Sequence, residues 1–235
     1  MSQTEPVRRP EGRLRAEGQR AVKPRNAATL IIVRRDRKKP QVLMGKRNSG
    51  HDFMPNLWVF PGGRIDRSDF RAPFATDLAP DVAARFEAHV SKSRGRALAL
   101  AAVRETFEEA GLLLAKKVPT RPLAGPWREF AAHGAAPDLE GLDIVARAIT
   151  PPMLAKRFDT WFLMADAERL ISLDREPDCG ELEEIAWVDF DEAIALPLPS
   201  VTRTMIGEAV SRMADPDRPR PFMRFGSGKT KFSHL

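Results

Sequence analysis

The most regular spacing of apolar positions in the chain lies within residues 97–114. If this segment is helical, apolar side chains recur every three or four residues and form one stripe, made of Leu100, Val103, Phe107, Ala110 and Leu114. The opposite face carries Glu105, Glu108 and Glu109, at i, i+3 and i+4. The pattern predicts a helix that packs its stripe on a core, ends at Gly111 and points three carboxylates away from that core.

Short runs of β-branched, aliphatic and aromatic residues predict strands in the rest of the chain. These strands are expected at residues 27–33, 41–44, 57–60, 144–149, 160–164 and 185–188. A short helix is expected at 127–132, and Ser200 is expected to cap a last helix. The apolar stripe of that last helix consists of Val201, Met205, Ala209 and Met213. Because strands and helices interleave, the sequence predicts one α/β domain with a mixed sheet between helical layers.

The stretch between the strand at 57–60 and the glutamate-bearing helix has a pattern of its own. Pro80 starts a segment in which Val82, Phe86 and Val90 recur every four residues, which predicts a short amphipathic helix. This helix is expected to fold back onto the domain. Its apolar side chains either shape a substrate pocket beside the carboxylates or serve as cover or as an interface, and the sequence leaves these roles open.

Both ends of the chain are polar and basic. Residues 1–24 offer no apolar face, which is typical of a disordered arm, and a mobile tail is expected over residues 214–235. The domain itself is therefore expected to span residues 25–213. Residues 1–25 hold seven Lys and Arg against three Glu, so they supply most of the formal net charge of +6. The remaining chain is nearly balanced and does not demand a nucleic-acid partner.

Cysteine usage and hydropathy set expectations about the compartment. Cys179 is the only cysteine, so no intrachain disulfide can form and a reducing cytoplasm is expected. No apolar segment resembles a signal peptide, and the longest aliphatic run, at residues 30–33, is too short to cross a bilayer, so no membrane partner is expected. The final Ser233-His234-Leu235 loosely resembles the peroxisomal address Ser-Lys-Leu, which would apply only in a eukaryote.

Three carboxylates on one helix face carry an energetic cost. Like charges one turn apart repel by a few tenths of a kcal/mol for each pair, and a bound cation would remove that repulsion. Ligands that are all oxygen atoms suit Mg²⁺ or Mn²⁺ better than zinc or copper. The glutamate face is therefore a candidate site for a hard divalent cation, although a Glu-rich face is more often only solvated surface.

Two segments of the chain together resemble the Nudix hydrolase family. The family's sequence box is a glycine, five residues, a glutamate, seven residues and then Arg-Glu-apolar-X-Glu-Glu-X-Gly-apolar. Its second half matches residues 104–112, with Thr106 at a position that is usually aliphatic. Upstream, residues 57–63 read Leu-Trp-Val-Phe-Pro-Gly-Gly, a short β-type run that ends in a glycine turn. The resemblance covers about residues 25–213 and implies an α/β/α sandwich with a mixed sheet.

The first half of the box departs from the family pattern. Five residues separate Gly63 from Asp69, a shorter carboxylate than the expected glutamate, whereas counting back eight positions from Arg104 reaches Arg96. Gly63 and Arg104 are 41 positions apart, against 14 in an uninterrupted box, so about 27 residues are inserted, at about residues 70–96. Such a split box resembles the Nudix branch typified by the peroxisomal coenzyme A diphosphatase.

The resemblance also implies roles for individual residues. Glu108 and Glu109 would be the principal ligands of Mg²⁺ or Mn²⁺, and Glu105 would be a further ligand or the catalytic base. Arg104 lies one turn before Glu108, so it would act in catalysis by holding that side chain in place. Nudix enzymes often draw a further acidic residue from the region of residues 181–184, and Glu184 is our choice for that role.

Three more residues are expected to contact the substrate. Arg47 follows a predicted strand at the loop that faces the diphosphate in the family fold, so it is a candidate phosphate ligand. Gly62 and Gly63 would let the backbone approach the substrate closely, because neither carries a side chain.

The Nudix family cleaves nucleoside diphosphates linked to a variable group X, so the expected partner is a small-molecule nucleoside diphosphate derivative. The split box favours coenzyme A (CoA) or acyl-CoA, cleaved to 3′,5′-ADP and a 4′-phosphopantetheine product. Another CoA-cleaving signature, Arg-X3-Gly-X3-Phe-Pro-Gly-Gly, is absent, because Asp52 and Asn56 occupy its Arg and Gly positions.

Alternatives from other classes remain open at the level of sequence. The enzyme could act on ADP-ribose, NADH or a dinucleoside polyphosphate, or the chain could be a ligand-sensing module whose box has decayed. Retention of all three glutamates argues against decay. A nucleic-acid enzyme would need a basic, aromatic-rich channel, and the chain has no Tyr. The sequence is compatible with a homodimer but does not test it.

Overall fold

The computed structural model describes residues 12–48, 50, 55–119, 121–175, 182–226 and 229–235. Within this part of the chain, nine strands form one mixed sheet in the order β11-β10-β7-β8-β1-β2-β3, with β4 paired to β1 and β9 paired to β2. The strands of this sheet are β1 (Arg25–Arg34), β2 (Gln41–Arg47), β3 (Trp58–Val59), β4 (Gly62–Arg64), β7 (Asp143–Ile149), β8 (Phe158–Asp166), β9 (Leu182–Asp189), β10 (Pro221–Gly226) and β11 (Lys229–His234). A separate antiparallel pair joins β5 (Ala115–Lys117) to β6 (Ala135–Pro137).

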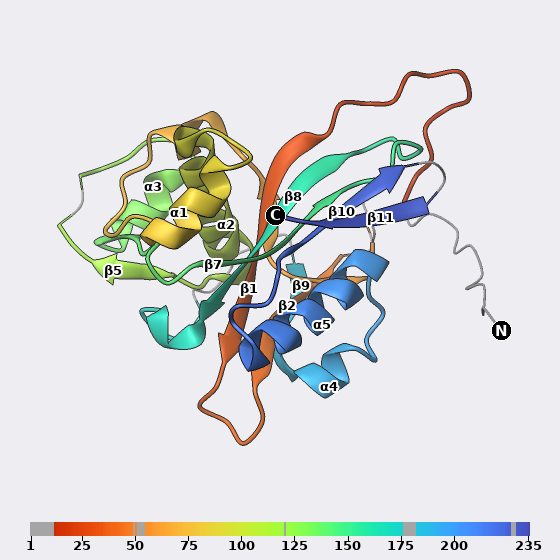
Figure 1. The fold of residues 1–235 in the computed structure, drawn as a ribbon. Helices are drawn as coiled ribbons and strands as arrows, with labels where there is room; N and C mark the ends of the chain where they lie inside the picture. Colours follow the sequence, from red (N-terminus) through yellow and green to blue (C-terminus); the bar gives the residue numbers. More distant parts are fainter. Residues whose placement is uncertain (1–11, 49, 51–54, 120, 176–181, 227–228) are drawn as a thin grey trace.

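Helices cover both faces of the large sheet, as Figure 1 shows. On one face lie α1 (Pro80–Glu87), α2 (Lys92–Ala110) and α3 (Trp127–Ala132), and on the other lie α4 (Phe190–Ala193) and α5 (Ser200–Ala214). Alternate residues of β1 feed the two cores: Leu30 and Ile32 pack with α2, whereas Ile31 and Val33 pack with α5. The predicted α/β/α sandwich with a mixed sheet is confirmed.

The glutamate-bearing segment forms α2, the longest helix of the described chain. The predicted apolar stripe is buried in the core on that face of the sheet, although its last member, Leu114, lies beyond the end of the helix and forms a β-bridge with Leu170. The helix begins earlier than predicted, after Ser91, whose hydroxyl accepts a hydrogen bond from the backbone of Arg94. It ends as predicted at Gly111, which adopts a left-handed conformation with φ 67°.

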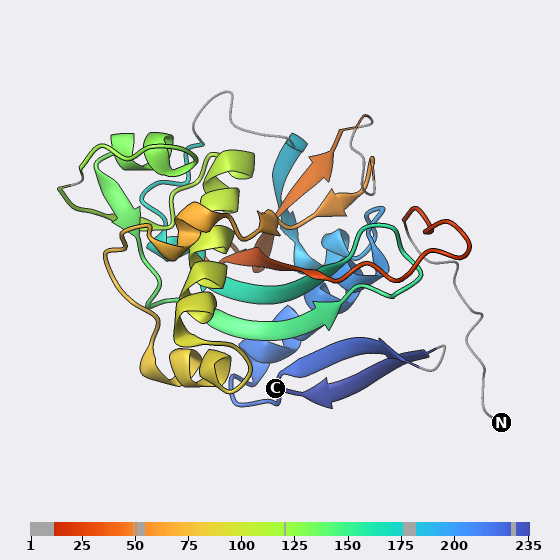
Figure 2. The same cartoon turned by 90° about the horizontal axis from the view of Figure 1, so that it is seen from above.

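The inserted segment folds back along α2, as Figure 2 shows with the 3-10 helix η1 (Arg67–Phe70) in orange and α1 in yellow. Val82 and Phe86 of α1 are buried in the same core as α2, and the ring of Phe86 lies 4.6 Å from that of Trp161. A side chain at Gly95 would crowd Phe86, so this glycine lets α1 and α2 approach closely. The apolar side chains of the insertion therefore act as cover for the core.

Polar contacts of Thr76 and Asp77 hold the segment before α1 in place. The Thr76 hydroxyl donates a hydrogen bond to the buried Asp138, and Asp138 also accepts a 3.0 Å hydrogen bond from Arg169. Asp77 accepts a 2.9 Å hydrogen bond from Nε of Arg96 on α2. Burial tends to raise the pKa of Asp138, but these hydrogen bonds from Arg169 and Thr76 outweigh burial and lower it.

The basic arm differs from the sequence expectation where the structure describes it. In place of a disordered segment, Leu14 forms a β-bridge with Leu154, and the backbone N–H of Arg15 donates to the carbonyl of Met153 over 2.9 Å. The side chain of Arg157 also donates to the carbonyl of Val22 over 2.7 Å. The arm takes part in these contacts through its backbone, so they leave no trace in a hydropathy pattern.

The C-terminal segment also differs from the mobile tail that the sequence predicted. Strands β10 and β11 pair with each other along their whole length, and β10 pairs in parallel with β7. Arg147 of β7 lies between two rings, 5.0 Å from the centroid of Trp161 and 4.6 Å from that of Phe222, and makes a two-pronged ion pair with Asp159. This cation–π packing anchors the hairpin on the sheet.

Replacing Phe222 by alanine is expected to lower the free energy of unfolding by about 3 kcal/mol, the usual loss for a buried phenylalanine. Phe232 on β11 provides the control, since it is 64% exposed while Phe222 is 9% exposed. Phe232→Ala is expected to change stability by less than about 0.5 kcal/mol. Denaturant titration of both variants measures the difference, and equal effects would show that the hairpin does not dock in solution.

The N-terminus of α5 differs from the sequence expectation. Ser200 is the first residue of α5 and not its cap, which is Pro199, and no side chain caps that terminus. This corrects the expected role of Ser200; the fixed φ of Pro199 sets the direction in which the chain enters the helix.

Among the described residues, every helix is too short or too polar to span a bilayer.

Candidate active site

Arg104 lies at the centre of a group of carboxylates between α2 and the start of the insertion. Its side chain is 5% exposed, and it donates to Asp69 through Nε over 2.9 Å and through Nη2 over 3.1 Å. Its Nη1 donates to Glu105 over 2.9 Å and to Glu108 over 2.7 Å. One planar guanidinium therefore fixes three carboxylates at once, which only arginine can do with its fork of donors.

Asp69 occupies the position that the family pattern gives to a glutamate. It is completely buried, and it closes a reciprocal cap at the start of η1, where the backbone N–H of Asp66 donates to Oδ2 of Asp69 over 2.8 Å. Arg96, the residue reached by counting back from Arg104, lies near the N-terminus of α2 and pairs with Asp77. The insertion thus follows Asp69, and the first half of the box is intact except for its shorter carboxylate.

Gly62 and Gly63 form β4, beside the middle of β1, where the sequence suggested a turn. The N–H of Gly62 donates to Oε2 of Glu109 over 2.8 Å. A side chain at Gly63 would overlap the carboxylate of Glu105, and one at Gly62 would lie 2.6 Å from the backbone of Thr29. Gly63 therefore lets β4 approach the carboxylate of Glu105 on α2, whereas Gly62 lets β4 approach β1.

Burial and mutual repulsion set the electrostatics of the cluster. Burial raises the pKa of Glu105, and the charge of Glu108 adds to this increase although Arg104 opposes it. Burial alone would lower the pKa of Arg104, but the hydrogen bond with Asp69 and the charges of Glu105 and Glu108 raise it overall. Arg104 is thus a permanent cation, and it acts through the carboxylates because it is too buried to meet a substrate.

The donor set of this cluster fits a hard divalent cation. Glu105, Glu108 and Glu109 offer oxygen atoms on one face of α2, the ligand type that Mg²⁺ and Mn²⁺ prefer. The described residues contain no set of three acidic, His or Cys side chains that already converges on one point. Two of the glutamates are turned toward Arg104, and Glu108, whose side chain is 36% exposed, can change rotamer without disturbing the core.

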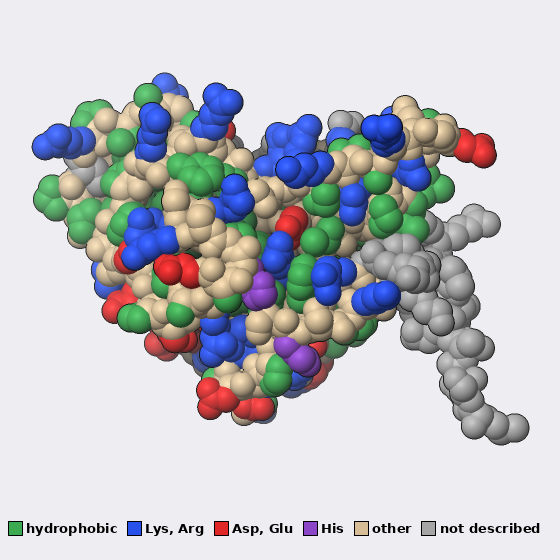
Figure 3. Space-filling model, turned by 45° about the horizontal axis from the view of Figure 1, so that its top comes forward, with side chains coloured by type: hydrophobic (Ala, Val, Ile, Leu, Met, Phe, Trp, Pro, Cys, Tyr) green, Lys and Arg blue, Asp and Glu red, His purple; other side chains and the backbone are tan. Residues whose placement is uncertain are grey.

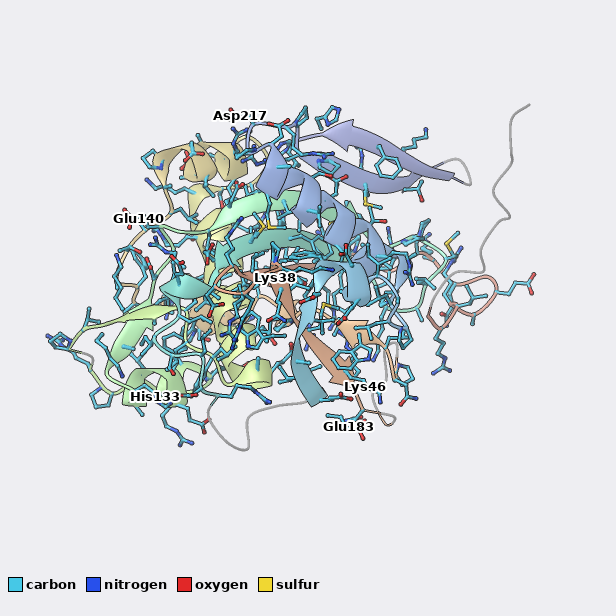
Figure 4. All side chains as sticks on the ribbon, turned by 90° about the horizontal axis from the view of Figure 1, so that it is seen from below. Lys38, Lys46, His133, Glu140, Glu183 and Asp217 are labelled. Atoms are coloured by element: carbon cyan, nitrogen blue, oxygen red, sulfur yellow. The ribbon has the colours of Figure 1, made fainter. Side chains whose placement is uncertain are left out.

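The remaining predicted site residues lie at the end of β2 and in β9. Arg47 is the last residue of β2 and is half-buried, and its backbone pairs with Leu57 and Asn56. Glu184 is exposed and lies opposite Lys46 in the strand register. Figure 4 shows Lys46 and Glu183 together at this edge of the molecule.

The register places Glu184 on the face of the sheet away from α2. Its neighbour Ile185 packs with the core of α2, whereas Ala186 packs with the core of α5, and alternation gives Glu184 the same face as Ala186. The structure therefore does not bring Glu184 to the glutamate cluster. Glu181, another acidic residue of this region, lies outside the described residues.

Sequence reasoning missed one contact of the cluster. The indole Nε1 of Trp127 donates to Oδ1 of Asp69 over 3.0 Å, from a position 58 residues further along the chain. A single tryptophan at the start of a short helix gives no local signal of such a contact. Only the fold brings α3 beside η1.

Comparison with known proteins agrees with this geometry. A family model described as the NUDIX domain matches residues 23–206. A crystal structure of a NUDIX hydrolase from Alicyclobacillus acidocaldarius superposes with a TM-score of 0.58 and 27% identity, over 79% of this chain and 90% of that one. The fold and the box define the class of protein: the chain belongs to the NUDIX family.

Two curated relatives narrow the comparison. The chain is 29% identical over 210 residues to "Putative nudix hydrolase 7" of Caenorhabditis elegans, covering 75% of this chain and 58% of that protein. It is 31% identical over 220 residues to "Acyl-coenzyme A diphosphatase NUDT19" of Gallus gallus, covering 66% of this chain and 55% of that protein. The chain thus spans somewhat more than half the length of these relatives. Nudix hydrolases generally use divalent metal ions.

Proposed function

We propose that the protein hydrolyses the diphosphate bond of CoA or acyl-CoA with Mg²⁺ or Mn²⁺, giving 3′,5′-ADP and a 4′-phosphopantetheine product. Water adds to one phosphorus and the P–O–P bond breaks, so each product keeps one of the two phosphates of the diphosphate, and the nucleotide product also keeps its 3′-phosphate. The observation that carries this proposal is the split box: Asp69 and Arg104 pair across an insertion, as in the CoA diphosphatase branch that the sequence resembles. The similarity to an acyl-CoA diphosphatase of Gallus gallus supports it.

In this proposal the charged residues of α2 have separate roles. Glu105, Glu108 and Glu109 would hold the ion, which would neutralise charge at the phosphoryl oxygens. Arg104 orients Glu105 and Glu108 through hydrogen bonds, and the N–H of Gly62 orients Glu109. Glu105 is also a candidate to accept a proton from water, because burial raises its pKa and makes the carboxylate a stronger base.

The cavity beside the insertion lies away from these carboxylates. A cavity of about 340 Å³ between α1 and α2 is lined by residues that include Pro80, Phe86 and Arg96. Arg96 precedes Glu105 by nine positions, which is about 14 Å along the helix and half a turn around it. The preference for CoA therefore rests on the split box and the relatives.

A nucleic-acid substrate finds no support on the visible surface. On the face shown in Figure 3, Lys and Arg side chains are spread over the whole face with Asp and Glu between them. A nucleic-acid channel would gather basic side chains and aromatic rings in one groove.

A substrate screen tests the proposal. Purified protein with Mg²⁺ or Mn²⁺ is incubated with CoA, acyl-CoAs, NADH, ADP-ribose and dinucleoside polyphosphates, and the products are identified by mass. We expect the highest kcat/KM for CoA or an acyl-CoA and no turnover in excess chelator. Faster cleavage of ADP-ribose or NADH would replace the CoA assignment while retaining the diphosphatase, and binding without turnover of any substrate would favour a ligand sensor.

A further inference from the structure

The buried carboxylate of Asp69 receives four N–H donors. Two come from Arg104 and one from the backbone of Asp66, all within the split box or its insertion. The fourth is the indole N–H of Trp127, at 3.0 Å from Oδ1. Trp127 is the only one of these donors that lies outside the box and its insertion, and it belongs to α3.

The indole of Trp127 is itself held firmly. The side chain is buried, and its ring meets that of Phe130 edge to face with centroids 5.2 Å apart. Phe130 in turn meets Phe107 of α2 at 5.4 Å in the same manner. This aromatic chain fixes α3 against the helix that bears the glutamates, so the N–H of Trp127 points at Asp69 from a rigid support.

The orientation of the Asp69 carboxylate determines the positions of Glu105 and Glu108 through Arg104. Nε and Nη2 of Arg104 are engaged by Asp69, and the guanidinium is planar, so the plane of Asp69 determines where Nη1 points. Nη1 is the atom that holds Glu105 and Glu108. A rotation of Asp69 would therefore move both glutamates away from their present places.

We propose that Trp127 is a positioning residue for the glutamate cluster, acting through Asp69 and Arg104. The indole N–H adds a fixed donor to the carboxylate of Asp69 from outside the box. The inference rests on the proposed metal-dependent diphosphatase activity for its kinetic test only.

The test compares Trp127→Phe with Trp161→Phe. The first change keeps an aromatic ring against Phe130 but removes the donor to Asp69. The control makes the same replacement at a second buried tryptophan, which also packs on a phenylalanine, Phe86, but does not contact the cluster. Both variants should lose a similar few degrees of melting temperature.

We expect Trp127→Phe to lower kcat by tenfold to a hundredfold, the usual range for a residue that orients a ligand, and to weaken the apparent affinity for Mg²⁺ or Mn²⁺. Trp161→Phe should leave kcat within twofold. In the background of Asp69→Asn, Trp127→Phe should cost less than twofold more, because its effect passes through Asp69. Equal kcat in the two tryptophan variants, or losses that multiply in the double variant, would overturn the proposal.

A second measurement needs neither activity nor metal. In metal-free protein labelled with ¹⁵N, the indole N–H of Trp127 should exchange slowly with water, and Asp69→Asn should shift its resonance more than those of the other three tryptophans. An unchanged or rapidly exchanging Trp127 signal would refute the contact itself. If the wild-type protein cleaved no diphosphate, the proposed function would fail while this measurement would still decide the pairing.

Discussion

Replacing Glu109 by glutamine is expected to lower kcat by roughly a thousandfold while the melting temperature stays within a few degrees of wild type. The amide oxygen of glutamine can still accept the N–H of Gly62, so the local geometry survives. The negative charge is lost, however, and with it the attraction for a divalent ion. Steady-state kinetics with titrated Mg²⁺, together with thermal unfolding, measure both effects.

The control for this variant is Glu129→Gln on α3, whose side chain is 75% exposed and lies beside Arg128. That change should leave kcat within twofold and the melting temperature unaltered. If Glu109→Gln kept more than a tenth of the wild-type kcat at saturating Mg²⁺, Glu109 would not be a principal ligand and the metal assignment would have to move to the other glutamates.

Arg104→Met should be the most destabilising single change at the site, with a loss of about 3 to 5 kcal/mol. Methionine fills a similar volume but leaves the buried Asp69 without its ion-pair partner and the two glutamates without their shared donor. Catalysis should fall as well, since Glu105 and Glu108 would no longer be oriented.

Arg96→Met is the matched control, because Arg96 is also on α2 and also pairs with an aspartate of the insertion. The Arg96–Asp77 pair is partly exposed, with side chains 29% and 43% accessible, so its loss should cost less than about 1 kcal/mol. Denaturant titration of the two variants measures the difference. Comparable losses would contradict the central role of the Asp69–Arg104 pair.

Much of the fold follows from local patterns. The stripe on α2 and the alternation in β1 each bury one face, and burial is what sets the period of apolar residues. Gly111 could be assigned as a helix end for a different reason: the residue after a helix often adopts the left-handed conformation, which glycine tolerates best. The patterns failed at the C-terminal hairpin, where the anchor is the contact of Arg147 with two rings and hydropathy carries no trace of it.

The candidate site was predictable to the extent that its residues share one helix face. Glu105, Glu108 and Glu109 are related by helical spacing, which needs no knowledge of the fold. The pairing of Asp69 with Arg104 needed the fold, because the insertion places the two residues 35 positions apart in the sequence. Glu184 was assigned by its place in the chain, and the face it occupies depends on a strand register that the sequence does not disclose.

The insertion also bears on how the site assembles as the chain folds. Asp69 and Arg104 are 35 positions apart, against about eight in an uninterrupted box. Loop-closure entropy grows only with the logarithm of loop length, so the longer connection costs about 1 kcal/mol more, and the burial of Val82 and Phe86 offsets this. The length of this connection can therefore change over evolution at little thermodynamic cost, while formation of the ion pair becomes a non-local and hence slower step of folding.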